Sequence, residues 1–290
     1  MNGWLVIDKP FGLTSSQVVG RVKRIIKPKK IGHAGTLDKF ATGVLPLAIG
    51  EATKTQDYAM DGQKKYSFDI IFGTETDTLD RDGQITQKDG YIPKKAEIEA
   101  ALPDFTGLID QTPPTYSAIK INGQRSSDLA REGKEVELAS RKILIENFII
   151  TGQPSETEYS FEVVCGKGTY IRALARDLSK KLGTCAHISR LERLKVGNFD
   201  IKNAISLERL EELVHNGALF ESLLPVGYVL DDIPVIKIDP SGSTKLRKGQ
   251  TVIVQGSQRP GKACAKYGDE VVAIGEIEGK AFRPLRVFNY

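Results

Sequence analysis

A stretch of small residues, GHAGTLDKFATGVLPLAIG at 32–50, constrains this chain more than any other part of its sequence. It contains Asp38, which is the sole acidic residue between Asp8 and Glu51. Glycine lacks a Cβ and adopts positive φ, so the backbone around this aspartate can approach a ligand closely. Asp38 is therefore our first candidate for chemistry. The alternative is an ordinary loop aspartate whose side chain bonds to its own turn.

The composition is that of an ordinary folded protein with a small basic excess. The chain has 290 residues, 40% hydrophobic and 27% charged, with a net charge of +4. This length can bury a substantial core in one large domain or two. The charge permits nucleic-acid binding without proving it, so clustering of the basic residues matters. Lysines and arginines cluster at 23–30 and at 64–65, and the competing interpretation of each cluster is a solvated helix face.

Several classes of protein are excluded by the pattern. No apolar run reaches 18 residues, and MNGWLVIDKP lacks the basic region and apolar stretch of a signal peptide, so we expect a cytoplasmic location and no membrane contact. Cys165, Cys185 and Cys264 form no CxxC pair. They predict neither a zinc site nor a disulfide framework, and we expect buried thiols.

Four helices are predicted from local signals. The first runs from Ser15 to Lys27, because Thr14 and Gln17 make a capping box and Pro28 ends the helix. The others are a short helix at 96–102, one at 170–182 that Thr169 caps and Gly183 terminates, and one at 207–215.

Two strands are predicted from alternation of apolar and polar residues. One covers 66–72 and places Tyr66 on its apolar face, and a polar, acidic loop at 74–84 follows it. The second covers 159–165. Beyond about Asp232 the sequence changes to four or five short β-like runs separated by Gly, Pro and Lys, with a helical turn at 243–247. This pattern suggests a small barrel, and by itself it defines only a small β module, for which an oligomerisation patch is one interpretation.

Five sequence blocks in a fixed order carry a family resemblance. They are DKPFGLTS at 8–15, GHAGTLD at 32–38, KKYSFDIIFGTETDTLDRDG at 64–83, PPTYSAIKINGQR at 113–125 and GKGTYIRALARDL at 166–178. Together they resemble the bacterial TruB family of tRNA pseudouridine synthases, over nearly the whole chain from about Leu5 to Phe288. The chain departs from the family at Lys39 and Phe40, where Pro and Leu usually follow the catalytic Asp.

The resemblance implies a fold, a domain division and a reaction. The fold is α/β, with a mixed, largely antiparallel sheet flanked by helices. Residues 1–231 would form the catalytic domain, and 232–290 a small RNA-binding β-barrel of the PUA type. The reaction converts the T-loop uridine at tRNA position 55 to pseudouridine. Isomerisation oxidises, hydrolyses and transfers nothing, so the chemistry demands neither a cofactor nor a metal.

The resemblance also assigns roles to individual residues. Asp38 would act as nucleophile or stabilise charge on the ribose. Arg172 would pair with it, and a first-turn arginine, which the helix dipole disfavours, is consistent with a specific partner. Tyr66 would stack on the target base and assist proton transfer, although by itself it reads as a core-edge residue.

Three further positions are assigned in the same way. Tyr170 and Leu191 match positions that line the uracil pocket, and alone they read as ordinary packing residues. His33 matches a position that packs against the T-loop where the base has been pulled out. The reacting atoms are blocked in a stacked loop, so the nucleotide must be flipped into the site.

The expected partner is tRNA, bound through its T-arm and, by the C-terminal domain, through its acceptor stem. No obligate protein partner is indicated. Two alternatives remain at this point: a non-catalytic RNA-binding or RNA-folding protein, and a related synthase that acts on another RNA. The combination of Asp38, Tyr66 and Arg172 favours an enzyme, because mere binding needs no carboxylate near phosphates.

Overall fold

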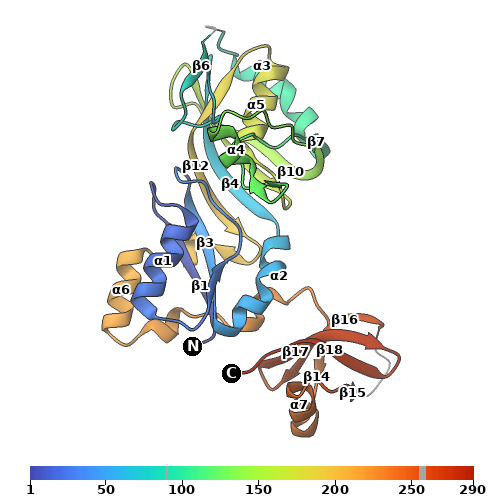
Figure 1. Ribbon diagram of the computed structural model, residues 1–290. Coiled ribbons are helices and arrows are strands. Elements are labelled where there is room, and N and C mark those ends of the chain that lie inside the picture. Colours follow the sequence, from blue (N-terminus) through green and yellow to red (C-terminus); the bar gives the residue numbers. More distant parts are fainter. Residues whose placement is uncertain (89–90, 255–258) are drawn as a thin grey trace.

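The computed structural model describes residues 1–88, 91–254 and 259–290 of the protein, and its larger sheet has nine strands. The main path of this sheet runs through β1 (Gly3–Lys9), β3 (Thr42–Ile49), β12 (Ala186–Val196), β4 (Lys64–Phe72), β11 (Glu158–Cys165), β10 (Arg141–Gly152) and β7 (Gly107–Gln111) (Figure 1). At its side, β2 (Ile31–His33) pairs with β3, and β13 (Phe199–Asp200) pairs with β12. Among these described strands, β12 and β3 are parallel and the other neighbours are antiparallel, so the expected mixed, largely antiparallel sheet is confirmed.

Strands β4 and β11 lie side by side and show the predicted alternation. The even-numbered residues of β4 and the odd-numbered residues of β11 are buried. Phe161 on β11 stacks against Phe68 with ring centroids 5.6 Å apart, and against Phe148 on β10 at 5.5 Å. These aromatic pairs, packed over one face of the sheet, make the part of the sheet next to the candidate site rigid.

Helices α1 (Ser15–Ile26) and α6 (Leu207–His215) pack beside β1 and β3. The predicted capping box of α1 is confirmed, since Thr14 accepts from the Gln17 backbone and the Gln17 side chain accepts from the Thr14 backbone. Lys27 follows the helix in the left-handed conformation, and Pro28 prevents its continuation. α6 therefore has its predicted bounds, and α1 ends one residue before the predicted Lys27.

Helices α5 (Ile171–Lys181) and α3 (Lys95–Ala101) cover the other end of the sheet. The predicted role of Thr169 as the cap of α5 is wrong, because its hydroxyl donates to the carbonyl of Gly166 at 3.1 Å. Tyr170 occupies the N-cap position, and its N–H donates to the side chain of Gln111 at 2.8 Å. Tyr170 makes no side-chain capping bond, and Gln111 from a distant strand instead fixes the backbone where α5 begins. Gly183 ends the helix with a φ of 70°, as expected.

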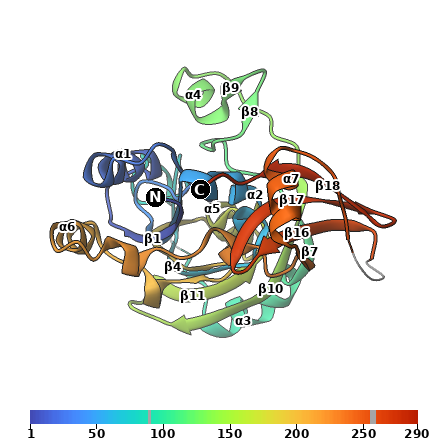
Figure 2. The ribbon, with the colours of Figure 1, turned by 90° about the horizontal axis from the view of Figure 1, so that it is seen from below.

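The remaining elements of this part are short. They are α2 (Gln56–Asp61), β5 (Thr74–Thr76), β6 (Ile85–Lys88), β8 (Lys120–Ile121), β9 (Gln124–Arg125), α4 (Ser126–Arg131) and the 3-10 helices η1 (Gly50–Thr55), η2 (Leu102–Phe105), η3 (Ile201–Asn203), η4 (Leu219–Ser222) and η5 (Val226–Val229). The acidic segment expected to be a loop at 74–84 begins as a strand, because β5 pairs with β6. Figure 2 shows the segment of β8, β9 and α4 projecting from the rest of the molecule. Within the described ranges, no helix has the length and apolar character needed to cross a membrane.

A second sheet of five strands follows near the C-terminus and forms a half-barrel. Its order is β14 (Val235–Lys237), β16 (Gly261–Tyr267), β17 (Glu270–Glu278), β18 (Ala281–Val287) and β15 (Val252–Ile253). The expected helical turn at 243–247 is a longer helix, α7 (Pro240–Arg247), because Asp239 caps it through the N–H of Gly242. The small β module predicted for this region is confirmed.

The half-barrel packs tightly against the larger sheet. One hydrophobic cluster contains Trp4 and Ala48 from the larger sheet together with Ile274 and Phe288 from the C-terminal region. At its rim, the guanidinium of Arg286 pairs with Asp57 at 2.9 Å. The two parts are therefore joined by an apolar contact as well as by the chain itself.

We predict that Phe161→Ala lowers the free energy of unfolding by about 3–5 kcal/mol, because the side chain is fully buried and its removal leaves a cavity among the stacked rings. Phe220→Ala is the matched control, since that ring is 71% exposed and its loss should cost less than about 0.5 kcal/mol. Urea unfolding followed by circular dichroism measures both values. Equal losses in the two variants would contradict the proposed packing.

Candidate active site

Asp38 lies in the loop between β2 and β3, and its neighbours fix this loop in place. The hydroxyl of Ser15, the first residue of α1, accepts from the N–H of Leu37 at 2.9 Å and donates to the carbonyl of Leu37 at 3.2 Å. Leu37 and Phe40 are buried on either side, whereas the Asp38 side chain remains 38% exposed. The departure from the family at Phe40 is therefore accommodated in the core, and the carboxylate stays accessible.

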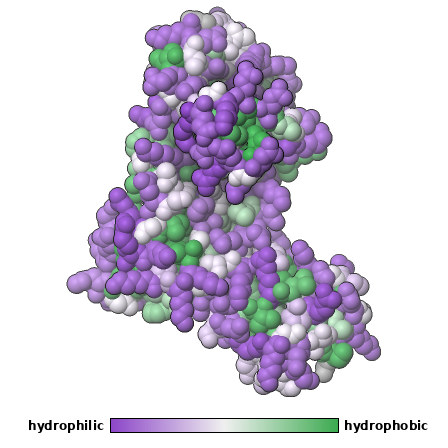
Figure 3. Space-filling view, in the orientation of Figure 1, coloured by the Kyte–Doolittle hydropathy of each residue, from purple (hydrophilic) through white to green (hydrophobic). Residues whose placement is uncertain are grey.

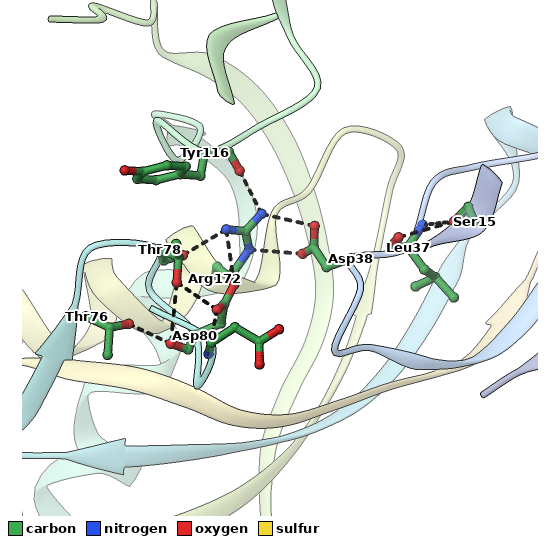
Figure 4. A network of polar contacts seen from close by, with 9 residues as sticks. Ser15, Leu37, Asp38, Thr76, Thr78, Asp80, Tyr116 and Arg172 are labelled. Atoms are coloured by element: carbon green, nitrogen blue, oxygen red, sulfur yellow. Dashed lines mark hydrogen bonds and ion pairs between the residues drawn. The ribbon is translucent and has the colours of Figure 1, made fainter. Parts of the chain in front are cut away.

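Arg172 makes a bidentate contact with this carboxylate through its guanidinium (Figure 4). Its Nε donates to Oδ2 of Asp38 at 3.0 Å, and its Nη2 donates to Oδ1 at 3.1 Å. Arg172 is the second residue of α5 and is only 4% exposed. The predicted pairing of the two side chains is confirmed, and the alternative of a solvated arginine is wrong.

The other guanidinium hydrogens of Arg172 reach two further segments. Nη1 donates to the carbonyl of Thr78 at 2.8 Å and lies 3.4 Å from Oδ2 of Asp80, while Nη2 also donates to the carbonyl of Tyr116 at 2.9 Å. An arginine has five N–H donors in a rigid plane, so these contacts use all the donors of Arg172. Arg172 thereby joins three loops that lie far apart in the sequence.

Asp80 is a second carboxylate of the site that the sequence analysis did not single out. Burial raises the pKa of Asp80, although the hydrogen bond from Thr78 and the charge of Arg172 both lower it. The Thr78 hydroxyl donates to Oδ1 at 2.7 Å, and the N–H of Asp82 donates to the same oxygen at 3.1 Å. The Thr and Asp spacing of TLDRD signals such a turn, but nothing local to it reveals the contact with Arg172.

Tyr66 and Arg193 lie opposite each other on β4 and β12 beneath the Asp38 loop. Tyr66 is 8% exposed, and burial raises the pKa of its phenol. Arg193 donates to the carbonyls of Val44 at 2.8 Å and Gly35 at 3.0 Å. Gly43 is required here, because a Cβ would lie 2.3 Å from the Arg193 carbonyl. The sequence analysis missed Arg193, whose role depends on the register of β12 against β3.

His33 lies half-buried at the end of β2. Burial lowers the pKa of its imidazole, and the nearby charge of Arg193 lowers it further. The ring is therefore neutral at pH 7, and within the described residues its Nδ1 has no hydrogen-bond partner. A neutral, partly exposed ring suits packing against a base.

Tyr170 and Leu191 come from two different elements, the start of α5 and the strand β12. Gln111 holds the backbone of Tyr170 at both its N–H and its carbonyl, at 2.8 and 3.1 Å. The guanidinium carbon of Arg141 lies 4.9 Å from the centroid of the Tyr170 ring. Leu191, 5% exposed on β12, belongs to the same cluster as Tyr66 and Leu37. Leu191 thus lies in the cluster beneath the Asp38 loop, and Tyr170 lies two residues before Arg172.

The two predicted basic clusters differ in the structure. The residues at 23–30 include five exposed lysines and arginines around the end of α1. Lys64, in contrast, is 8% exposed, and its amine donates to the carbonyls of Met60 and Gly62. Lys65 pairs with Glu162 at 2.9 Å. A phosphate-binding cluster at 64–65 is therefore not supported, because the first amine turns inward and the second is neutralised.

Lys9 is a further buried cation beneath the site. It is 0% exposed, and its amine donates to the carbonyls of Pro10, Leu13 and Lys39 at 3.1, 2.5 and 3.2 Å. Burial lowers its pKa to about 8, although the charge of Asp38 opposes the shift. Lys9 thus ties β1 to the residue that follows Asp38.

The comparisons with known proteins agree with this geometry. A family model described as "TruB family pseudouridylate synthase (N terminal domain)" matches residues 23–171, and one described as "tRNA pseudouridylate synthase B C-terminal domain" matches 172–231. Proteins named tRNA pseudouridine synthase B are 45% identical in Caulobacter vibrioides and 40% in Brucella melitensis, with all of this chain and 96% of each relative covered.

Solved structures show the same fold. A Cbf5-Nop10-Gar1 complex contains a chain with 25% identity and a TM-score of 0.76, covering 99% of this chain and 85% of that one. An H/ACA RNP bound to a substrate RNA containing 2'-deoxyuridine gives the same TM-score at 22% identity, which concerns the fold alone.

Fold and site therefore define a pseudouridine synthase. Among these enzymes, the chain belongs to the TruB family, whose members named above are tRNA pseudouridine synthases, and it isomerises uridine of tRNA to pseudouridine.

We predict that Lys9 makes stability rise with pH between about 8 and 10.5. Above pH 8 the folded protein has released this proton, whereas the unfolded chain keeps it up to the ordinary value of 10.5. The unfolded state then binds more protons, so the free energy of unfolding increases with pH. Urea unfolding of wild type and Lys9→Met from pH 7 to 10.5 measures the effect. The free energy of unfolding of the wild type, relative to that of Lys9→Met, should increase as the pH rises. If this difference does not change with pH, the amine stays charged in the folded protein.

Proposed function

We propose that the uridine isomerised is the T-loop uridine at position 55 and that Asp38 is the catalytic group. The observation that carries this proposal is the two-armed contact of Asp38 with the buried Arg172, which leaves the carboxylate 38% exposed. A carboxylate held in this way is fixed in position and open to a ligand. The position in tRNA rests on the resemblance to the TruB family.

The chemistry requires a negative charge near the ribose. The carbon–nitrogen glycosidic bond breaks, the uracil turns, and carbon 5 bonds to the ribose in its place. Asp38 acts either as a nucleophile or as the group that stabilises positive charge and removes a proton. Arg172 supplies the paired opposite charge that a carboxylate needs when bound RNA excludes water from the site.

Base flipping assigns roles to the residues around this pair. Tyr66, on the floor of the site, stacks on the uracil and is placed for proton transfer. Tyr170 and Leu191 line the pocket that receives the base, and the neutral ring of His33 packs against the T-loop nucleotides that remain. Stacking and edge contacts of this kind are how proteins bind single extruded bases.

The remaining surface serves tRNA binding. The exposed basic residues at 23–30 lie around α1, on the largely hydrophilic face that Figure 3 shows, and suit phosphate contacts. We assign residues 1–231 to the catalytic domain and 232–290 to a PUA-like domain that binds the acceptor stem, while the catalytic part binds the T-arm. A tRNA substrate places the enzyme in the cytoplasm.

Asp38→Asn should abolish pseudouridine formation and leave tRNA binding intact, because the amide keeps the shape of the carboxylate but lacks its charge and nucleophilicity. The measurement is incubation with unmodified tRNA, mapping of pseudouridine by nucleotide, and filter binding of the same tRNA. Asp110→Asn is the control, since that exposed aspartate pairs with Lys142 at the sheet edge. Turnover by purified Asp38→Asn, or modification at another nucleotide, would refute the assignment.

Arg172→Ala should reduce turnover more than Arg172→Lys, and both should reduce it below the wild type. Alanine leaves the buried Asp80 without its cation, which typically costs about 3–5 kcal/mol of stability. Lysine restores the charge but lacks the planar fork that spans both oxygens of Asp38.

The matched control for these two variants is Arg176→Lys, one turn later on α5, where Nη2 donates to the carbonyl of Thr112. Single-turnover rates and thermal melting of each variant give the comparison. Near wild-type turnover in a folded Arg172→Ala would show that another cation maintains the charge of Asp38.

A further inference from the structure

Phe11 and Arg81 form a contact across the open side of the candidate site. Phe11 lies in the loop between β1 and α1, and Arg81 lies in the turn between β5 and β6. The guanidinium carbon of Arg81 is 5.4 Å from the centroid of the Phe11 ring. The ring is 56% exposed and Arg81 is also exposed, so both side chains meet at the surface.

The neighbours of these two residues belong to the Asp38 site. The N–H of Gly12 donates to the carbonyl of Lys39 at 3.1 Å, directly after Asp38. On the other side, Asp80 lies 3.4 Å from Arg172, which grips Asp38 from α5. Arg81 therefore lies next to Asp80 in one loop of the ion-pair network, and Phe11 is joined to the Asp38 loop through the bond of Gly12.

The turn around Arg81 is acidic, which is unusual for a surface that approaches RNA. Asp77, Asp80 and Asp82 lie in the same turn, and a polyanion approaching Asp38 would be repelled by them. Arg81 is the cation of this turn. Within the described part of the chain, its guanidinium has one protein acceptor, the carbonyl of Ser189, at a long 3.5 Å. Most of its donors are therefore available to a ligand.

We propose that Phe11 and Arg81 bind a nucleotide of the RNA substrate next to the flipped uridine, with Arg81 on its phosphate and Phe11 against its base. A planar guanidinium and an exposed aromatic ring are the groups that proteins use for these two parts of a nucleotide. An exposed cation–π contact is weak, so the two side chains can separate and bind the RNA with little loss of free energy. This inference rests on the proposed function, because it assumes that RNA enters beside Asp38.

The test is equilibrium binding of unmodified tRNA at several salt concentrations, together with kcat and KM for pseudouridine formation. Arg81→Ala should weaken binding several-fold and reduce the slope of log Kd against log salt by about 0.7–0.9, the loss of one phosphate contact. Phe11→Ala should raise Kd at least about fivefold with the slope unchanged, as expected for lost stacking. Arg81→Lys should retain the slope and lose part of the affinity. KM should change more than kcat in each variant.

Arg209→Ala and Phe220→Ala are the matched controls, since Arg209 pairs with Glu212 on α6 and Phe220 is 71% exposed in η4. Wild-type Kd and salt slope in both Arg81→Ala and Phe11→Ala would overturn the inference. So would a fall in kcat and melting temperature at unchanged Kd, which would mean that the pair only holds the Asp80 turn. A wild type that binds tRNA but does not modify its T-loop would refute the proposed function instead, and the binding data would still decide the role of Phe11 and Arg81.

Discussion

A single buried guanidinium organises the functional half of this molecule. Arg172 lies between the carboxylates of Asp38 and Asp80 and also binds two backbone carbonyls. Each of these partners comes from a loop, and loops without such a common partner would adopt several arrangements. The pairing holds the exposed carboxylate of Asp38 in place without leaving the buried charge of Arg172 unpaired in the interior, which would be costly.

The sheet below the loops fixes the positions of the side chains at the base of the site. Strands β4 and β12 carry Tyr66, Leu191 and Arg193 to adjacent positions by their register. Because side chains alternate along a strand, a shift of one residue would turn all of them to the opposite face. The hydrogen bonds of Arg193 to the carbonyls of Gly35 and Val44 then position the loop above the sheet relative to β12. The stacked phenylalanines beside β4 resist such a shift.

Local signals in the sequence predicted the elements whose causes are local. The capping box of α1, the alternation in β4 and β11 and the position of Asp38 in a small-residue loop belong to this class. The errors have different causes. The contact that fixes the start of α5 comes from Gln111, 59 residues away from Tyr170, and not from Thr169. Lys64 turns inward to carbonyls only two and four residues before it, which the strand pattern did not show. Asp80, Arg193 and Lys9 were missed because only the folded chain shows what they touch.

The hydrophobic cluster shared by the two sheets has a consequence for the order of folding. Trp4 packs in the same cluster as Phe288, and the bond from Lys54 to the carbonyl of Val287 spans 233 residues. Contacts of such long separation form late, since the loop between them must close first. During synthesis from the N-terminus, the part of this cluster that Ile274 and Phe288 cover stays open until the last strands leave the ribosome. An emerging chain of this kind exposes that apolar surface for longer than a protein whose two parts share no cluster, and transiently exposed apolar surface is prone to aggregation.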